Sequence, residues 1–423
     1  MLRARESALR EPMALALRGT LLSPHAAGGT LFEADGLLLV DAEGTIRYAG
    51  PFRAAKYRGP VDDVRPNLIT PGFIDAHAHF PQTRIIGCAT GPLLDWLANS
   101  VFPEEARFTR AAYAKTVAAE LVGRLAQAGT TTVALFSSSS PSATATCFSA
   151  LAEAGLRGIV GLTWMERLGP PALRITTKAA VAASERLIRR WHGFDHDRLR
   201  FAVTPRFALS CSRSMLRAAG DLAGAHDLPV QTHIAENDHE GVATLKAHPY
   251  ASSYLDVYDQ AGLLGPRTIL AHAIHLTRRD FNRIGETDST IAHCPDSNFF
   301  LGSGRMRLKP PLSLGIRVGL GSDVAAGRSF SMRRAMASAY DNALAVGHPV
   351  ALPELLRLAT FGGAEVLGCA ATTGSLEVGK EADVVVVPQR RATPTLDAAL
   401  AGLIFDTDET HVARCYVRGR RLV

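Results

Sequence analysis

The chain has 423 residues, of which 47% are hydrophobic and 20% charged, and its formal net charge at pH 7 is +6. This composition is typical of a globular protein, and the length is enough for one large domain or two ordinary ones. No apolar run reaches the roughly 18 residues needed to cross a bilayer, and no apolar segment follows the N-terminal arginines, so we expect neither membrane insertion nor secretion.

Charge and cysteine content exclude several classes of protein. The positive excess is mostly arginine and does not alternate with aromatic residues as in nucleic-acid-binding grooves, so we predict no nucleic-acid partner. The six cysteines are scattered without a Cys-x-x-Cys pair, which argues against a zinc ribbon or a disulfide framework. Reduced thiols of this kind indicate a cytoplasmic location.

Residues 13–67 contain short strand patterns separated by glycine turns, as in residues 37–50. The twelve residues before them are charged and unpatterned, which suggests the hypothesis that translation starts at Met13. The same strand character returns in residues 374–423. We therefore predict that the two ends of the chain pair into a small β-sandwich domain.

Between these ends, residues 68–373 alternate short apolar strands with helix-length amphipathic stretches such as residues 111–125. This alternation is typical of βα units around a parallel sheet. Eight candidate strands lie near Phe73 and at residues 131–136, 158–165, 199–204, 230–233, 268–272, 291–293 and 318–322. The prediction is an α/β fold with a (β/α)8 TIM-type barrel, whose active site lies where the strands end.

The first barrel strand ends in His77 and His79, one residue apart. Side chains at positions i and i+2 of a strand point to the same face, so both imidazoles can reach one metal ion. Taken alone, the pair is equally consistent with two hydrogen-bonded histidines. The connection that follows is the longest at this end of the barrel, and long loops there commonly form substrate pockets.

Further polar side chains come at the ends of later strands. His233 and Glu236 follow the fifth strand, His272 ends the sixth, and Asp323 follows the eighth. Because all strand ends meet at one face of a barrel, these groups and the first two histidines should form one site. Imidazoles and a carboxylate suit Zn²⁺ or Fe²⁺ with an open position for water, whose pKa the metal lowers to roughly 7.

These motifs together resemble the amidohydrolase superfamily and, within it, the guanine deaminase family. The superfamily features are His77, His79, His233, His272, Asp323 and residues 379–383. The family features are residues 79–82, 93–97, 204–207, 233–237, 294–304 and 321–327. The resemblance covers nearly the whole chain.

The resemblance implies a role for each candidate residue. The implied ligands of one Zn²⁺ per chain, with Fe²⁺ as the alternative, are His77, His79, His233 and Asp323. The implied catalytic residues are Glu236, Asp323 and His272. The implied purine-binding residues are Gln82, Arg206, Phe207 and Trp96, and Trp96 packs either in a lid or in the core. No lysine ends the fourth strand, which favours one metal ion over two.

The implied reaction is hydrolytic deamination of guanine to xanthine and ammonia, in purine catabolism or salvage, by a homodimer. Asp323 would receive the proton of the attacking water, and Glu236 would protonate the ring and help the amine to leave. A guanidinium and a carboxamide can supply donors to the carbonyl and ring-nitrogen acceptors of a neutral base, which is consistent with Arg206 and Gln82 as purine-binding residues.

Two segments depart from the family pattern, the serine-rich residues 137–140 and Asp296, and we expect them to change the pocket floor. This expectation puts the choice of purine in more doubt than the reaction. The alternatives are another mononuclear aminohydrolase acting on a different purine, a pterin or a triazine, and a catalytically silent scaffold. A silent barrel would usually lack metal ligands, whereas this chain keeps all of them. The unrelated zinc deaminases are excluded because they need a Cys-x-x-Cys pair.

Overall fold

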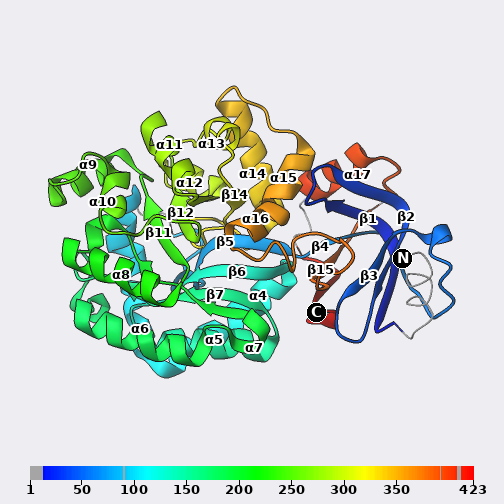
Figure 1. Ribbon diagram of the computed structural model, residues 1–423, viewed down its shortest axis with the longest axis horizontal. Coiled ribbons are helices and arrows are strands. Elements are labelled where there is room, and N and C mark those ends of the chain that lie inside the picture. The colour runs from blue at the N-terminus through cyan, green and yellow to red at the C-terminus, as the bar shows by residue number, and fades with distance from the viewer. Residues whose placement is uncertain (1–12, 89–90, 391, 407–410) are drawn as a thin grey trace.

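The computed structural model describes residues 13–88, 91–390, 392–406 and 411–423. A β unit built from both ends of the chain packs against one side of a larger α/β barrel (Figure 1). Residues 1–12, on which the predicted start at Met13 depends, lie outside the described residues.

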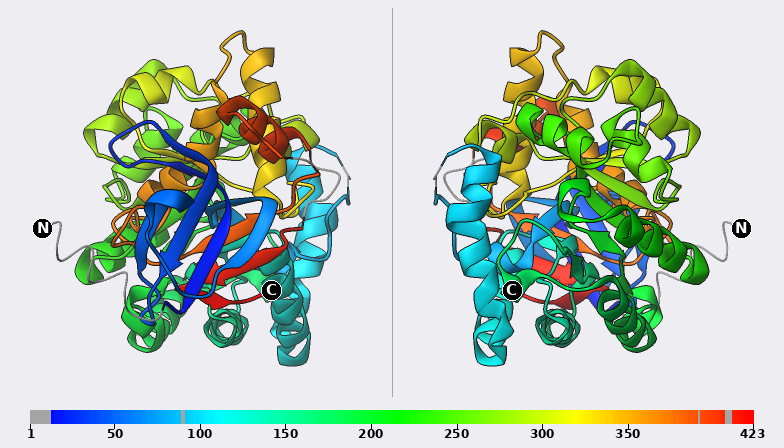
Figure 2. Two further views of the ribbon diagram at one scale, coloured as in Figure 1. Left: turned by 90° about the vertical axis from the view of Figure 1, so that its right-hand side faces the viewer. Right: turned by 90° about the vertical axis from the view of Figure 1, so that its left-hand side faces the viewer.

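The predicted small β domain is present as one seven-stranded sheet in the order β17-β16-β15-β4-β1-β2-β3. Figure 2 shows the blue N-terminal and red C-terminal strands side by side. The strands are β1 (Leu15–Pro24), β2 (Thr30–Val40), β3 (Ile46–Pro51), β4 (Asp62–Pro71), β15 (Val384–Val387), β16 (Arg414–Val417) and β17 (Arg420–Arg421). Along β2, Leu38 and Val40 belong to one hydrophobic cluster and Leu37 and Leu39 to another, because successive side chains point to opposite faces. The domain limits at residues 67 and 373 stay a prediction.

The eight predicted barrel strands are confirmed, and they form two parallel four-stranded sheets, β5-β6-β7-β9 and β11-β12-β13-β14. They are β5 (Phe73–His79), β6 (Thr130–Phe136), β7 (Arg157–Gly161), β9 (Leu199–Phe201), β11 (Val230–Ile234), β12 (Thr268–His272), β13 (Thr290–His293) and β14 (Val318–Leu320). A short additional pair joins β8 (Thr163–Trp164) and β10 (Thr204–Pro205). Parallel pairing of Val203 with Val230 links the sheets on one side, and the Asp323 amide donates to the His77 carbonyl at 2.8 Å on the other, which closes the barrel.

Helices surround the barrel strands (Figure 1). The described helices are α2 (Leu93–Trp96), α3 (Phe102–Glu105), α4 (Ala111–Gln127), α5 (Pro141–Ala154), α6 (Thr177–Trp191), α7 (Phe194–Asp197), α8 (Arg213–His226), α9 (Asp238–Ala247), α10 (Tyr254–Asp259), α11 (Arg278–Glu286), α12 (Pro295–Phe300), α13 (Lys309–Ser313), α14 (Met332–Ala345), α15 (Leu352–Ala359), α16 (Phe361–Val366) and α17 (Leu396–Phe405). The predicted amphipathic stretch at 111–125 is α4, which buries Ala114, Val117, Leu121 and Leu125 at helical spacing.

The long connection between β5 and α4 is made of short helical turns. A turn at Phe80–Gln82 is followed by α2, a π-turn at Leu97–Val101, α3 and a turn at Ala106–Thr109. Buried apolar side chains hold this connection against the barrel, among them Val101 and Phe108, which are both fully buried. The connection thereby brings α2 and α3 to the end of the barrel where the polar strand ends lie.

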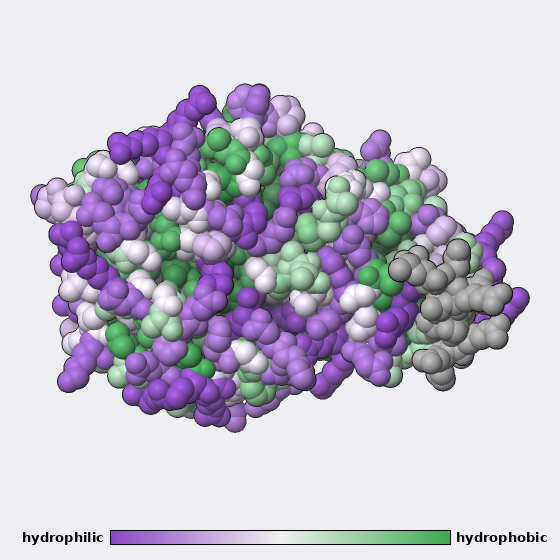
Figure 3. All heavy atoms as spheres, in the orientation of Figure 1, coloured by the Kyte–Doolittle hydropathy of each residue, from purple (hydrophilic) through white to green (hydrophobic). Residues whose placement is uncertain are grey.

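Figure 3 shows hydrophilic side chains over most of the visible face, with hydrophobic ones in scattered groups. The apolar side chains fill the core clusters instead. Among the helices of the described ranges, none is long and apolar enough to cross a membrane. All six cysteines are free thiols, as their spacing predicted.

Candidate active site

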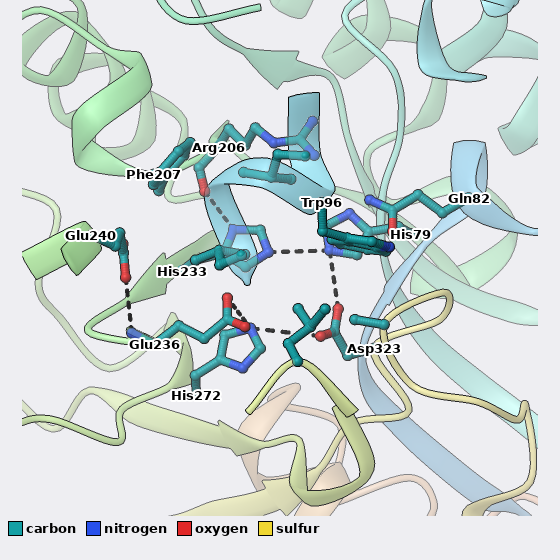
Figure 4. A pocket seen from close by; sticks show the side chains of 14 residues that line it. His79, Gln82, Trp96, Arg206, Phe207, His233, Glu236, Glu240, His272 and Asp323 are labelled. Atoms are coloured by element: carbon teal, nitrogen blue, oxygen red, sulfur yellow. Dashed lines mark hydrogen bonds and ion pairs between the residues drawn. The ribbon is translucent and has the colours of Figure 1, made fainter. Parts of the chain in front are cut away.

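Five side chains that could bind a metal meet at the carboxyl end of the barrel, and Figure 4 shows all of them except His77. Asp323 Oδ1 lies 3.2 Å from Nε2 of both His77 and His79, and His79 Nε2 lies 3.1 Å from Nε2 of His233. His272 Nε2 is 3.7 Å from the other carboxylate oxygen, Oδ2, of Asp323. The strand ends therefore converge as the barrel predicted.

The hydrogen bonds on the outer side of this cluster determine which ring nitrogens face its centre. His233 Nδ1 donates to the Arg206 carbonyl at 2.6 Å, and His272 Nδ1 donates to Asn298 Oδ1 at 2.9 Å. Their Nε2 atoms therefore carry lone pairs that point inward. The Nε2 atoms of His77 and His272 are buried without a hydrogen-bond partner. A divalent cation would satisfy these groups, so the residues present fit a metal site.

Burial sets the protonation of the cluster. It lowers the pKa of His79 to about 4 and holds the pKa of His233 well below its usual value. Burial alone would raise the pKa of Asp323, but the imidazoles of His77 and His79, whose Nε2 atoms lie 3.2 Å from its Oδ1, hold that pKa well below the usual value. Neutral imidazoles and an ionised carboxylate are the protonation states that bind metals.

The predicted ligand set shares three residues with a group of candidate ligands that lie close together in the structure. Ligand atoms of His77, His233, His272 and Asp323 all lie within 4.8 Å of one another. His79, the fourth predicted ligand, contacts Asp323 and His233 as described above. His272 is thus a further candidate ligand beside the predicted four.

Glu236, on the loop after β11, faces the same centre. Its Oε1 accepts a hydrogen bond of 3.0 Å from the Ser303 hydroxyl, and its Oε2 lies 3.5 Å from His272 Nε2. Burial and the nearby charge of Asp323 raise the pKa of Glu236 to about 8, against the opposing effect of the Ser303 hydrogen bond. A carboxyl group with such a pKa can both donate and accept a proton near neutral pH.

A cavity with about 380 Å³ of empty space, open solvent included, lies beside the cluster and Glu236. All four predicted purine-binding side chains line it, namely Gln82, Trp96, Arg206 and Phe207. The indole of Trp96 donates to the Cys88 carbonyl at 2.8 Å, so Trp96 is part of the cavity wall. Other lining residues include Leu301 and Ala326, which lie within the family motifs, and Glu240, which the sequence did not single out. The cavity combines an apolar wall with a few polar groups, as is usual for small-molecule sites.

Sequence reasoning missed the buried carboxylate of Glu105. It accepts two hydrogen bonds from the Arg206 guanidinium, at 2.6 and 3.1 Å, and one from the Gln82 amide at 3.2 Å. The spacing contained a signal of this burial. Glu105 lies four residues after Val101 and eight residues after Leu97, and helical spacing of this kind places all three side chains on one buried face. Ser303 was missed as well, although it lies within the family motif at residues 294–304.

The two segments that depart from the family pattern do not line the cavity. Ser140 caps the N-terminus of α5 through the Ala143 amide, and the Ser138 hydroxyl accepts from the Ser140 amide at 3.0 Å. Asp296 accepts from the Arg328 amide at 2.7 Å and from its guanidinium at 2.6 Å. Both segments therefore stabilise neighbouring loops, and the expected change of the pocket floor is not seen among the lining residues.

Comparison with known proteins matches residues 68–422 to the amidohydrolase family. The chain is 36% identical to the guanine deaminase of Escherichia coli over 417 residues, which cover 95% of this chain and 94% of that protein. It is 38% identical to a probable guanine deaminase of Deinococcus radiodurans over 418 residues, with coverage of 95% and 94%.

Solved structures give the same result. A guanine deaminase from C. acetobutylicum, with guanine bound in its active site, superposes with a TM-score of 0.90 at 32% identity and covers 97% of this chain and 100% of that one. The guanine deaminase structure from Bradyrhizobium japonicum has a TM-score of 0.90 at 32% identity, with coverage of 97% and 99%.

Proposed function

The chain belongs to the amidohydrolase family, and we propose that it catalyses the hydrolytic deamination of guanine to xanthine and ammonia. The observation that carries this proposal is one cavity in which the metal-binding cluster, Glu236 and two base-binding side chains all meet. The related structure with guanine in its active site supports guanine as the substrate. This reaction belongs to purine catabolism or salvage.

We propose one Zn²⁺ per chain as the metal, with Fe²⁺ as the alternative, held by His77, His79, His233 and Asp323. When bound, the ion lowers the pKa of a water to about 7 and so supplies the nucleophile at neutral pH. The fourth barrel strand is followed by Pro205 and Arg206, without the lysine that a second metal would need.

Three side chains move protons or stabilise charge during the reaction. Asp323, ionised within the cluster, accepts the proton of the water that attacks guanine C2. Glu236 carries a proton to the ring nitrogen beside C2 and then to the departing amine, which its raised pKa allows. His272, 3.5 Å from Glu236, lies where it can stabilise the oxygen that adds to the reacting carbon.

The opposite side of the cavity recognises the base. Arg206 and Gln82 donate to the carbonyl and ring-nitrogen acceptors of guanine, while Phe207 and Trp96 pack against its ring. Adenine carries an amino group where guanine has its 6-carbonyl, so it would leave a guanidinium donor unpaired. The same donors disfavour pterins and triazines whose acceptors lie elsewhere.

The test is ammonia and xanthine release from guanine by metal-replete protein, with adenine, a pterin and a triazine run in parallel. Preferred turnover of guanine supports the proposal. Equal or faster turnover of any of the other compounds contradicts it. A chain without activity on all four would support the silent scaffold, which the presence of every predicted catalytic residue disfavours.

Homodimer formation and a cytoplasmic location stay predictions. Sedimentation of the purified protein would test the first, and fractionation of cells would test the second.

A further inference from the structure

Glu105 lies behind the two side chains that recognise the base. Its side chain is only 2% exposed, and it comes from α3 in the connection after the first barrel strand. Arg206 Nη1 donates to Glu105 Oε2 at 2.6 Å and Nη2 donates to Oε1 at 3.1 Å. This two-point contact fixes the plane of the guanidinium. It still leaves one N–H on each Nη atom, and the Nε–H, for other acceptors.

The same carboxylate orients Gln82. The Ala325 amide can only donate, so its 3.2 Å contact identifies the side-chain oxygen of Gln82 as the acceptor. The nitrogen of Gln82 then donates to Glu105 Oε1 at 3.2 Å and keeps one N–H free. Glu105 therefore holds both purine-binding side chains as hydrogen-bond donors, and Figure 4 shows Arg206 and Gln82 on the side of the cavity away from Glu236.

Glu105 also balances charge. Arg206 is 3% exposed, and its guanidinium carbon lies 5.3 Å from the centre of the Phe102 ring, an apolar neighbour. In such surroundings an uncompensated cation would attract any anion strongly. With Glu105 ionised, the pair has no net charge and presents only its remaining N–H donors.

We propose that Glu105 is the positioning residue for base recognition: it orients Arg206 and Gln82 as donors and cancels the guanidinium charge, so that the site prefers a neutral purine to a purine anion. This inference rests on the proposed function. It has a consequence for turnover, because xanthine loses a ring proton in mildly alkaline solution more readily than guanine does. The neutral site would then bind the ionised product less well than the substrate.

The experiment measures the inhibition constants of two competitive inhibitors for the wild type and for Glu105→Gln in mildly alkaline buffer. Hypoxanthine is neutral and keeps the 6-carbonyl, whereas xanthine is largely an anion there. In Glu105→Gln, we expect the inhibition constant of hypoxanthine and the KM of guanine to rise about 10-fold or more, since the donors lose their orientation. Xanthine anion should bind as well as before or better, because the guanidinium charge is no longer cancelled.

Two further variants separate orientation from charge and from folding. Glu105→Asp keeps the negative charge but has a shorter side chain. The KM of guanine should therefore rise, while the preference for hypoxanthine over the xanthine anion persists. In an Arg206→Gln background, adding Glu105→Gln should change the ratio of the two inhibition constants by less than about 3-fold, because Glu105 acts through Arg206.

Glu104→Gln is the matched control. Glu104 is the neighbouring buried carboxylate, but it contacts Arg107 at 2.8 Å and the Tyr113 hydroxyl, away from the cavity. The Glu104→Gln substitution should leave both inhibition constants and the metal content unchanged. If Glu105→Gln weakened the binding of hypoxanthine and of the xanthine anion equally, the proposal would be overturned. Loss of a merely structural carboxylate would loosen the site for both purines. Direct measurement of hypoxanthine and xanthine binding decides this point even if the protein does not turn over guanine. Failure of this inference can therefore be distinguished from failure of the proposed function.

Discussion

Glu236→Gln tests the proton transfer that we propose for the Glu236 carboxyl group. Glu236 lies 3.5 Å from His272 Nε2, and its ligand atoms are not part of the tight metal-binding group, so its loss should leave the metal in place. The amide that replaces it can still accept from Ser303, as the carboxylate does at 3.0 Å. The substitution therefore keeps the shape and removes only the exchangeable proton.

The expected effect follows from what general acid–base catalysis contributes. Loss of the proton carrier should lower kcat by roughly 10²- to 10⁴-fold, or about 3 to 5 kcal/mol of barrier, with a much smaller change in KM. The assay is xanthine formation from guanine, followed together with elemental analysis of the purified variant and guanine binding. A kcat within a few-fold of the wild type would remove Glu236 from the mechanism. Loss of metal would instead mean that Glu236 supports the cluster.

Three other outcomes are expected. Elemental analysis should find one divalent metal per active chain, and chelation should abolish turnover until Zn²⁺ is restored; two metals per active chain would contradict the mononuclear site. Asn298→Ala should reduce metal affinity or kcat about 10- to 100-fold, because it removes the acceptor that fixes the ring of His272, and unchanged kinetics and metal content would refute this role. Arg206→Ala should raise KM for guanine about 10-fold or more while the metal stays bound, and unchanged guanine kinetics would contradict the recognition scheme.

Much of the fold could be predicted because the barrel depends on a local pattern. Apolar strands such as Thr268–His272 and amphipathic helices such as Ala111–Gln127 each show their own periodicity, so the eight strands appear where the alternation placed them. The β domain was also visible at both ends of the chain, although its strands join one continuous sheet. That arrangement depends on pairing between β4 and β15, whose partners are more than 300 residues apart in sequence.

The metal cluster was predictable for a similar reason. His77, His79, His233, His272 and Asp323 all lie near the carboxyl ends of barrel strands, and barrel topology alone brings these ends together. The serine-rich segment at 137–140 misled the prediction of the pocket floor, because capping residues and cavity residues look alike in sequence. Its serines cap α5 and support the loop before it.

By itself, the sequence determined the class of fold and the candidate metal ligands, since these follow from periodicity and from the position of each residue near the end of its own strand, and the family resemblance implied Glu236 as the proton carrier. Only the tertiary structure decided how the base-recognition side is built. Glu105 meets Arg206 across 101 residues of chain, and Gln82 is oriented by the amide of Ala325, 243 residues away. Such contacts depend on how a long connection packs over the barrel, and no local pattern specifies which buried carboxylate will face which cation.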